Sequence, residues 1–327
     1  MKVDYRALKE RFSSMLVRVG FESSRAEMVA RVFAETTFDG VYSHGINRFP
    51  RFIGDVKAGT VDPVAVPRLI RRSGAMEQWD GQKGPGILNA LYCTERAIAL
   101  AKKSGIGCVG LRNTNHWMRG GTYGWKAAEQ GLMFLGWTNT IPNMPAWPGN
   151  AVSQGNNPFI VAIPHEKAPL VLDMAMSQYS YGKLEWYRRN GKQLPEYGGY
   201  DLENRLTKDP AAILESGRIL PIGLWKGSAL SLVLDLSAAI LSGGSTSCRI
   251  GEGATETDLS QVYMAVDIGR FMEQEKIDHL IEETLQYNKT RNPGSRCPGQ
   301  RSMEERMANR KSGIEVPDRL WKEIGEL

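Results

Sequence analysis

Short apolar runs alternate with helical segments from about residue 75 onward, and this alternation constrains the fold more than any other feature of the sequence. Between the first two runs, residues 122–130 form an alanine-containing helix candidate. Short apolar runs between helical segments indicate buried strands, and a succession of strands and helices is typical of an α/β layer. The sequence therefore predicts an α/β lobe whose strands include residues 108–111, 133–137, 159–163 and 170–172.

The start and the end of the chain have mainly helical patterns. Apolar residues recur at helical spacing over residues 8–16, and Gly20 ends that segment. Ser24 and Glu27 have the spacing of a capping box, which predicts a helix that opens at Ser24. The last sixty residues are also expected to be mostly helical, with a break at residues 292–294.

The stretch between the predicted strands and the C-terminal helices is mixed. Residues 181 to about 218 are rich in glycine, proline and charge, so we expect a loop with short helices. A helix over residues 228–241 follows, and the alternating run at residues 261–266 predicts one more strand.

The chain contains one Gly-x-Gly-x-x-Gly sequence, at residues 105–110. The dinucleotide fingerprint needs a strand before the glycines and a helix after them, so that the pyrophosphate meets the helix N-terminus. Here the order is reversed, because residues 94–103 are helical and residues 108–111 form a strand. We interpret the motif as a helix C-cap that leads into a strand, and not as a phosphate site.

The composition limits the class of protein. The chain has 327 residues, 42% apolar and 24% charged, which suits a soluble protein of two domains or of one large core with an inserted lobe. No apolar run is long enough for a membrane span and the N-terminus lacks a signal-peptide core, so a cytoplasmic protein is expected. Four cysteines without a Cys-x-x-Cys pair suggest free buried thiols.

The charged residues do not favour a nucleic-acid or metal partner. The net charge is only +5, and lysines and arginines are scattered along the chain without a basic stripe. No His-Glu-x-x-His or comparable ligand spacing is present, so no metal site is predicted. A small anionic substrate suits the mild positive charge at least as well as a nucleic acid does.

His44 and Arg48 form the most informative pair of polar residues. In a helix they would lie one above the other on the same face, although Pro50 either kinks such a helix or begins a new one. A histidine exchanges a proton near neutral pH, and an arginine grips a carboxylate with two parallel hydrogen bonds. Together they suit an enzyme that holds a 2-oxo acid and protonates its ketone. Taken alone, the pair is more often a solvated histidine beside an arginine.

Three further places are candidates for ligand contact. His116 follows a predicted strand, where α/β proteins commonly bind ligands, but a structural histidine in a turn is equally frequent. Asp173 ends another strand and can accept hydrogen bonds from a ribose or cap the next helix. Lys226 precedes Ser228, a predicted N-cap, and a lysine at a helix start favours a phosphate.

With these residues in hand, the chain resembles the type-2 malate/L-lactate dehydrogenase family of nicotinamide-dependent oxidoreductases, which is distinct from the Rossmann dehydrogenases. The longer strings 43–53, 115–121 and 225–228 resemble the 2,3-diketo-L-gulonate reductase branch. The similarity runs nearly end to end, through residues 42–45 with Arg48, 115–116, 157–158, 172–175 with 182–183, 220–221 and 226–227.

The resemblance implies an α/β (α+β), non-Rossmann fold of two parts. A largely helical domain made from both chain ends, residues 1–75 and about 225–327, would pack against an α/β cofactor lobe at about residues 76–224. It also implies a homodimer that shares the cofactor site, which agrees with the rejected glycine motif.

The same resemblance implies roles for individual residues. His44 is expected to be the general acid and base, Arg48 the carboxylate anchor, and His116 a residue near the substrate. The positions expected to contact the cofactor are Leu170, Val171, Leu172, Asp173, Met174, Ala175, Trp225, Lys226 and Gly299.

Two departures from the family pattern affect these expectations. Asn156 stands where the family often has threonine, at a possible substrate contact. Gln300 and Arg301 follow Pro298-Gly299 where an acidic residue is usual, and an added arginine can favour the 2′-phosphate of NADP. The cofactor is therefore NAD(H) or NADP(H), with NADH slightly favoured.

The resulting hypothesis is reduction of a 2-oxo sugar acid, 2,3-diketo-L-gulonate above others, to the 2-hydroxy acid. The alternatives are a sister activity on malate, lactate, ureidoglycolate or a cyclic imino acid, and a non-catalytic homologue that binds a small molecule. Substrate profiling distinguishes these alternatives.

Overall fold

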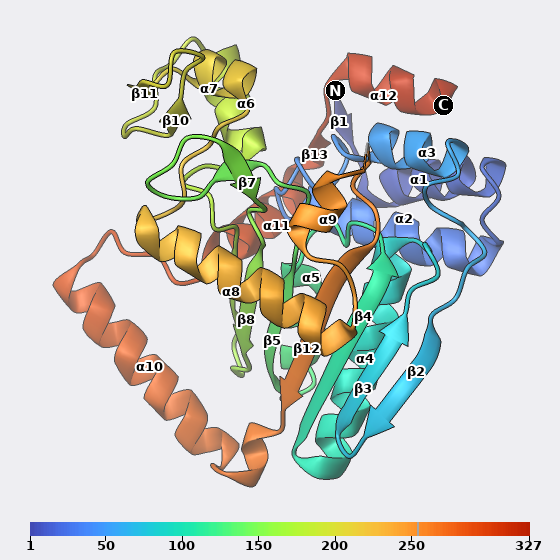
Figure 1. Cartoon of the computed structure of the whole chain (residues 1–327). Coiled ribbons are helices and arrows are strands. Elements are labelled where there is room, and N and C mark those ends of the chain that lie inside the picture. Colours follow the sequence, from blue (N-terminus) through green and yellow to red (C-terminus); the bar gives the residue numbers. More distant parts are fainter. Residues whose placement is uncertain (254) are drawn as a thin grey trace.

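The computed structural model describes residues 1–253 and 255–327, and its centre is a mixed sheet of seven strands (Figure 1). The strands lie in the order β2-β3-β4-β12-β5-β8-β9. The predicted strands are confirmed as β4, β5, β8, β9 and β12, whereas β2 and β3 were not predicted. Their bounds are β2 Arg68–Ser73, β3 Met76–Asp80, β4 Ile106–Thr114, β5 Met133–Thr138, β8 Phe159–Ile163, β9 Leu170–Met174 and β12 Leu259–Val266.

The strand order shows that the sheet takes strands from both sides of residues 76–224. Strands β3 and β4 are parallel, and the other neighbours in the sheet are antiparallel. Strand β12 lies between β4 and β5, and β2 forms one edge, yet the predicted division placed both with the helical domain. Neighbours in a sheet need not be neighbours in sequence, so the pattern along the chain could not reveal this pairing.

Helices cover both faces of the sheet. On one face lie α4 (Gly86–Ser104) and α5 (Gly121–Ala128), and on the other lies α8 (Trp225–Ser242). Alternate residues of a strand point to opposite faces. Accordingly, Val109 belongs to the large core that includes α4, whereas Cys108 belongs to the smaller core that includes α8. Figure 1 shows α8 crossing in front of the sheet.

The rejected fingerprint is a helix C-cap that leads into a strand, as predicted, and its second and third glycines also allow close helix packing. Gly105 ends α4 in the left-handed conformation, at φ +86°. A Cβ atom on Gly107 would lie 2.2 Å from the carbonyl oxygen of Ala97 in α4. A Cβ atom on Gly110 would lie 2.4 Å from the carbonyl oxygen of Leu241 in α8. The motif therefore brings helices close to both faces of β4.

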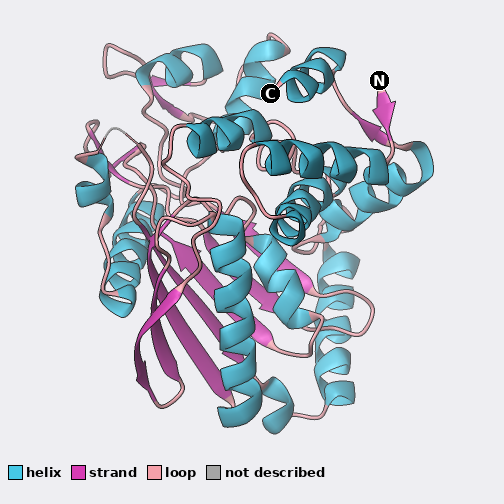
Figure 2. Cartoon of the chain, turned by 90° about the vertical axis from the view of Figure 1, so that its right-hand side faces the viewer, coloured by secondary structure: helices cyan, strands magenta, loops and turns pink. Residues whose placement is uncertain are grey.

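The two chain ends together form a helical layer above the sheet (Figure 2). Its core contains the stacked rings of Phe12 and Phe49, 4.2 Å apart, and Phe33 meets Phe49 edge-on. The strands β1 and β13 pair, which joins the two ends. The elements of this layer are β1 Lys2–Val3, α1 Tyr5–Arg18, α2 Ser23–Phe38, α3 Phe49–Lys57, α11 Gln300–Ser312, β13 Ile314–Glu315 and α12 Asp318–Glu326.

A small lobe with its own core extends from the sheet, where a loop with short helices was predicted. Tyr179, Leu184 and Ile213 are buried in that core. Its elements are α6 Tyr181–Arg189, β10 Gly199–Tyr200, β11 Leu206–Thr207 and α7 Pro210–Ser216. The remaining elements are β6 Met144–Pro145, β7 Val152–Gln154, α9 Ser247–Gly251, the 3₁₀ helix Ile268–Arg270 and α10 Gln274–Arg291.

Three local predictions need comment. The side chain that caps α2 is Glu22, which accepts from the backbone N–H of Ser24, so the predicted cap was wrong by two residues. All four cysteines are free, but only Cys93 and Cys108 are buried. None of the helices in the described part of the chain is long and apolar enough to span a membrane.

Candidate active site

The loops that follow β4, β5 and β9 lie at the same end of the sheet, where these strands terminate, below the helical layer. The antiparallel pairing through β12 and β8 gives these three strands a common direction. Asn115 and His116 follow β4, and Asp173 lies near the end of β9. Strand ends at one edge bring distant segments together, and ligand sites in α/β proteins commonly form there.

His44 lies in a run of turns and not in a helix. Helix α3 begins at Phe49, and Pro50 occupies its first turn, where the missing N–H costs nothing. Of the two predicted effects of Pro50, it therefore begins a new helix. Arg48 is the N-cap of α3, and its backbone N–H donates to the carbonyl oxygen of Gly45 over 3.0 Å. His44 and Arg48 are therefore not stacked on one face of a helix. The consecutive turns of residues 42–48 still keep Arg48 close enough for its charge to act on His44.

Gly45 allows this turn to pack tightly against α2. A Cβ atom at Gly45 would lie 2.3 Å from Oγ1 of Thr37, and such an overlap forces a shift. The same hydroxyl accepts from the backbone N–H of Ile46 over 2.9 Å and donates to the carbonyl oxygen of Phe33 over 2.8 Å. The two residues after His44 are thus held against Thr37 of α2, and this contact positions the imidazole.

The structure places His44 beside His116. Their rings are 5.8 Å apart with an interplanar angle of 24°. Nδ1 of His44 lies 3.0 Å from Oγ of Ser43. Nδ1 of His116 accepts from the backbone N–H of Met118 over 2.9 Å. The proton of neutral His116 therefore resides on Nε2, which leaves that nitrogen as a donor.

Asn115 fixes the position of the His116 loop. Its side-chain amide donates to the carbonyl oxygens of Thr60, Lys83 and Gly84 over 2.9 to 3.2 Å. A Cβ atom on Gly86 would lie 2.2 Å from the carbonyl oxygen of Asn115, so α4 begins directly against this loop. The Asn-His pair therefore combines a structural amide with an imidazole that faces the site.

Burial holds both imidazoles in the neutral form. Desolvation lowers the pKa of His44, Arg48 and Arg119 lower it further, and the charge of Asp173 opposes them. The pKa of His116 lies well below its ordinary value because of desolvation and the nearby charges of Arg48 and His44. A shift of this direction is typical of groups in functional sites.

A cavity of about 130 Å³ adjoins His116. Arg48 lines it, and Nη2 of Arg48 pairs with Oε2 of Glu256 over 3.3 Å. His44 does not line this cavity itself, but its ring is next to that of His116, which does. The structure thus brings together the three residues expected to handle substrate, and it adds Arg51, Asp55 and Glu256 to the walls.

These added residues were missed for different reasons. Arg51 and Asp55 follow Arg48 by three and seven residues in α3, so helical spacing could have placed them on the same face. Glu256 lies in the segment before β12, and no local signal connects it to Arg48. Only the pairing of β12 beside β4 brings it to the site.

Asp173 accepts a hydrogen bond from the start of a helix, as predicted, but the helix is α5 and not the one that follows Asp173 in the chain. Its Oδ2 accepts from the backbone N–H of Gly121, the first residue of α5, over 2.7 Å. The prediction was the helix after Asp173, whereas α5 precedes it in the chain. The side chain remains exposed, and its charge is close enough to affect His44.

The segments expected to contact cofactor lie along β9, an edge strand. Gly299 has φ +89°, and a Cβ atom there would lie 3.3 Å from the backbone nitrogen of Val171. That nitrogen donates to the carbonyl oxygen of Pro298 over 3.3 Å. Beyond Ala175, the backbone N–H of Ile222 donates to the carbonyl oxygen of Met176 over 2.8 Å. The turn before Trp225 and Lys226 thus adjoins the end of β9.

The start of α8 differs from its prediction. The helix begins at Trp225, with Leu224 as an N-cap that has no side-chain hydrogen bond. Ser228 is therefore inside the first turn, and its hydroxyl accepts from the backbone N–H of Trp147 over 3.1 Å. Trp225 is 64% exposed. The backbone N–H groups of Lys226, Gly227 and Ser228 donate to carbonyl oxygens of residues 222–224, so the Lys226 side chain is the group left for an anion.

Two positions depart from the family pattern, and both have local partners. Oδ1 of Asn156 accepts from the hydroxyl of Thr140 over 3.2 Å and from Nδ2 of Asn143 over 3.1 Å. Arg301 lies 4.0 Å from Oε1 of Glu305, and its side chain is 77% exposed. Asn156 is thus held within the protein, and Arg301 lies on the outer surface of α11.

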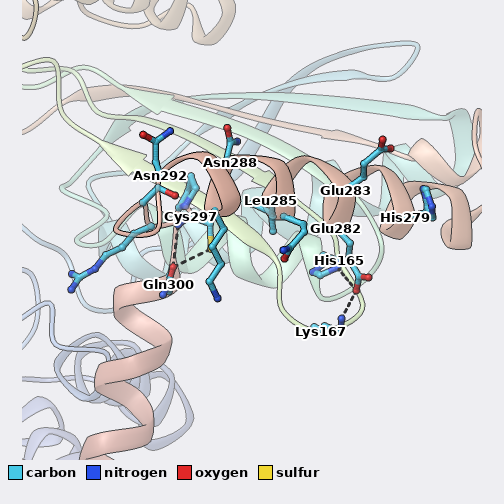
Figure 3. Close-up of a pocket in the computed structure, with 15 residues that line it drawn as sticks. His165, Lys167, His279, Glu282, Glu283, Leu285, Asn288, Asn292, Cys297 and Gln300 are labelled. Carbon is cyan, nitrogen blue, oxygen red and sulfur yellow. Dashed lines mark hydrogen bonds and ion pairs between the residues drawn. The ribbon is translucent and has the colours of Figure 1, made fainter.

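A larger hollow lies elsewhere, between α10 and the turn that joins β8 to β9 (Figure 3). It measures about 970 Å³, and His165 and His279 line it. His279 is exposed, and Lys167 forms an exposed ion pair with Glu282. No role was predicted for either histidine, and the hollow contains neither His44 nor His116.

The fold and the site together define a non-Rossmann α/β oxidoreductase. The chain belongs to the malate/L-lactate dehydrogenase family, whose model matches residues 3–325. It is 44% identical over 333 aligned positions to a 2,3-diketo-L-gulonate reductase of Escherichia coli O6:K15:H31, and the match covers all of both chains. The predicted family and fold class are confirmed.

Solved structures agree with this assignment. The sulfolactate dehydrogenase of Methanocaldococcus jannaschii is 30% identical, with a TM-score of 0.91 over 100% of this chain and 96% of that one. The malate dehydrogenase of Entamoeba histolytica is 26% identical, with a TM-score of 0.92 over the same shares. The chain is therefore a dehydrogenase of the family that acts on 2-hydroxy acids, and the family implies a nicotinamide cofactor and a small-molecule substrate.

Proposed function

We propose that this enzyme reduces the C2 ketone of a 2-oxo sugar acid to the 2-hydroxy acid, with 2,3-diketo-L-gulonate as the preferred substrate. The observation that supports it most is the partly buried pair of His44 and His116 beside Arg48, at the end of the sheet where β4 and β9 terminate. The name of the relative that is 44% identical supports the choice of substrate.

Arg48 would anchor the substrate carboxylate. Its guanidinium forms two parallel hydrogen bonds with a carboxylate, and its single contact with Glu256 leaves donors unused. The side chain is 24% exposed, so water competes only weakly for it. A bound carboxylate also balances the positive charge of Arg48 beside the histidines.

His44 would donate a proton to the C2 oxygen, and Nε2–H of His116 would donate a hydrogen bond to the substrate. When bound, the nicotinamide cofactor supplies the hydride to C2. Desolvation and Arg48 lower the pKa of His44 against the opposing charge of Asp173, which favours the neutral imidazole. An anionic substrate offsets the charge of Arg48 and raises that pKa, so substrate binding favours the protonated acid.

The residues along β9 fit an extended dinucleotide. The family resemblance assigns it to Leu170–Met174, Ala175, Trp225, Lys226 and Gly299. Gly299 exposes backbone against Val171, where any Cβ atom would meet the strand. At the other end, the ammonium group of Lys226, at the start of α8, suits a phosphate. We propose NADH ahead of NADPH, because Glu305 opposes the charge of Arg301.

We also propose that the enzyme is a homodimer that uses the outer face of α8. Leu232, Val233, Leu236 and Ile240 recur at helical spacing on that face and are 45 to 73% exposed. An apolar stripe of this kind marks an interaction surface. Light scattering after size exclusion should give twice the chain mass, and Val233→Asp should give the single-chain mass. A monomeric wild type contradicts the proposal.

A spectrophotometric screen tests the proposed activity. NADH and NADPH are each combined with 2,3-diketo-L-gulonate, pyruvate, oxaloacetate and a cyclic imino acid, and loss of the reduced cofactor's absorbance is followed. We expect the highest kcat/KM with 2,3-diketo-L-gulonate and NADH. A higher kcat/KM with another substrate would assign a sister activity of the family. A folded protein that oxidises neither cofactor with any of these substrates would contradict the proposal.

A further inference from the structure

One face of α3 extends the site beyond the carboxylate anchor. Arg48, Arg51, Phe52 and Asp55 are spaced by three, four and seven residues, so they share that face. All four line the cavity beside His116. If Arg48 holds the carboxylate of a substrate, the carbon atoms beyond C2 lie in the same cavity as the charged groups of Arg51 and Asp55.

Arg51 and Asp55 have unused hydrogen-bonding capacity. Arg48 is paired with Glu256. By contrast, the side chains of Arg51 and Asp55 form no ion pair and no side-chain hydrogen bond among the described residues. Desolvation raises the pKa of the Asp55 carboxyl group, and the charges of Arg51 and Arg48 only partly offset it. Asp55 is half-buried and Arg51 is exposed, so both side chains are open to a ligand in the cavity that supplies a donor and an acceptor.

The chemistry of these two groups selects between substrates of the proposed reaction. A three-carbon 2-oxo acid ends in a methyl group, which satisfies neither a guanidinium nor a carboxylate. A polyhydroxylated acid offers hydroxyl hydrogens to Asp55 and hydroxyl or carbonyl oxygens to Arg51. Sites that hydrogen-bond a substrate hydroxyl discriminate strongly against analogues that lack it.

We infer that Arg51 and Asp55 form a subsite that recognises the hydroxyl groups of a sugar acid. This inference rests on the proposed function, because it takes the Arg48 end of the cavity as the place of the carboxylate. Asp55 accepts from a substrate hydroxyl, and Arg51 donates to an oxygen beyond C2. Specificity for sugar acids over short 2-oxo acids then comes from α3.

The test measures kcat/KM for 2,3-diketo-L-gulonate and for pyruvate in the wild type, Asp55→Asn and Arg51→Gln. We expect each substitution to lower the sugar-acid value about ten- to hundredfold, mainly through KM, and to leave the pyruvate value within about twofold. Gly54→Ala, on the outer side of the same helix with nothing within 4 Å, should change neither value. Equal losses for both substrates would indicate a structural role and overturn the inference.

A binding measurement separates this inference from the proposed function. Calorimetry compares L-gulonate with L-lactate as ligands of the wild type and of Asp55→Asn. We expect tighter binding of L-gulonate to the wild type and loss of that preference in the variant, even if neither oxo acid is turned over. Equal affinities of the wild type for the two acids would overturn the subsite, whatever the activity screen shows.

Discussion

Two regions of this enzyme contain a pair of histidines beside arginine or lysine and carboxylates, and they differ in every other respect. The region around His44 and His116 adjoins a cavity of only about 130 Å³, and the hollow around His165 and His279 measures about 970 Å³. In the small region desolvation lowers the pKa of both imidazoles, the turn of His44 is hydrogen-bonded to α2, and Asn115 bonds the His116 loop to the carbonyl oxygen of Thr60. In the large one, most charged side chains lie on the exposed surface of α10.

The comparison shows that the larger space is the poorer candidate for chemistry. Charges in a desolvated site interact more strongly than those in water, and fixed loops hold them without reorganisation. The exposed ion pair of Lys167 and Glu282 is screened by solvent and contributes little. The buried region should therefore respond strongly to substitutions that the large hollow tolerates.

The largest expected difference is between His44→Ala and His279→Ala. Loss of a general acid lowers turnover about a hundred- to ten-thousandfold, and cofactor affinity should stay nearly unchanged. His279 lines the large hollow and is exposed, so its substitution should leave kcat within about twofold of the wild type. Steady-state rates and NADH titrations of both variants check this, and similar losses in the two would remove the distinction between the regions.

Arg48→Lys and Arg296→Lys form the second pair. Lysine keeps the charge but loses the fork, so we expect KM for the oxo acid to rise about ten- to hundredfold in the first variant. Arg296 is an exposed residue of the large hollow, and its variant should keep the wild-type KM. An unchanged KM in Arg48→Lys would argue against a carboxylate at that residue.

A smaller effect distinguishes two glycines. Gly45→Ala forces a Cβ atom to within 2.3 Å of Thr37, and overpacking of this kind costs about 1–3 kcal/mol of folding free energy. Gly54→Ala meets nothing within 4 Å in the middle of α3 and should be neutral or slightly stabilising. Denaturant unfolding of both variants measures the difference. Equal stabilities would show that the His44 turn is not held by close packing.

Much of the sheet could be predicted from local patterns. The apolar runs at β4, β5, β8, β9 and β12 are confirmed, as is the helix-to-strand order of the glycine motif. Strand β2 begins with Arg68 and Leu69 and has no buried residue to produce an alternating pattern, and β3 buries two acidic residues, Glu77 and Asp80, beside Trp79. The place of β12 inside the sheet depends on long-range pairing, so local patterns could not predict it.

The site too was predictable only where local sequence patterns define it, and not where it depends on contacts between distant segments. His44, Arg48 and His116 belong to motifs of the family, and the structure brings them together. Helical periodicity past Pro50 would have added Arg51 and Asp55, because Pro50 starts α3. Glu256 reaches Arg48 only through the tertiary fold, and Asp173 contacts α5 across the sheet edge. Such contacts between distant segments leave no local signal.

The pH dependence of the reduction tests most directly whether His44 supplies the proton. The acid must be protonated to react, so kcat/KM should be highest at low pH and fall as pH rises through the pKa of His44. Because that pKa is lowered, the fall should begin on the acid side of the ordinary value for histidine, about 6.5. The limb should vanish from the residual activity of His44→Gln. A limb that persists unchanged in that variant would contradict the assignment.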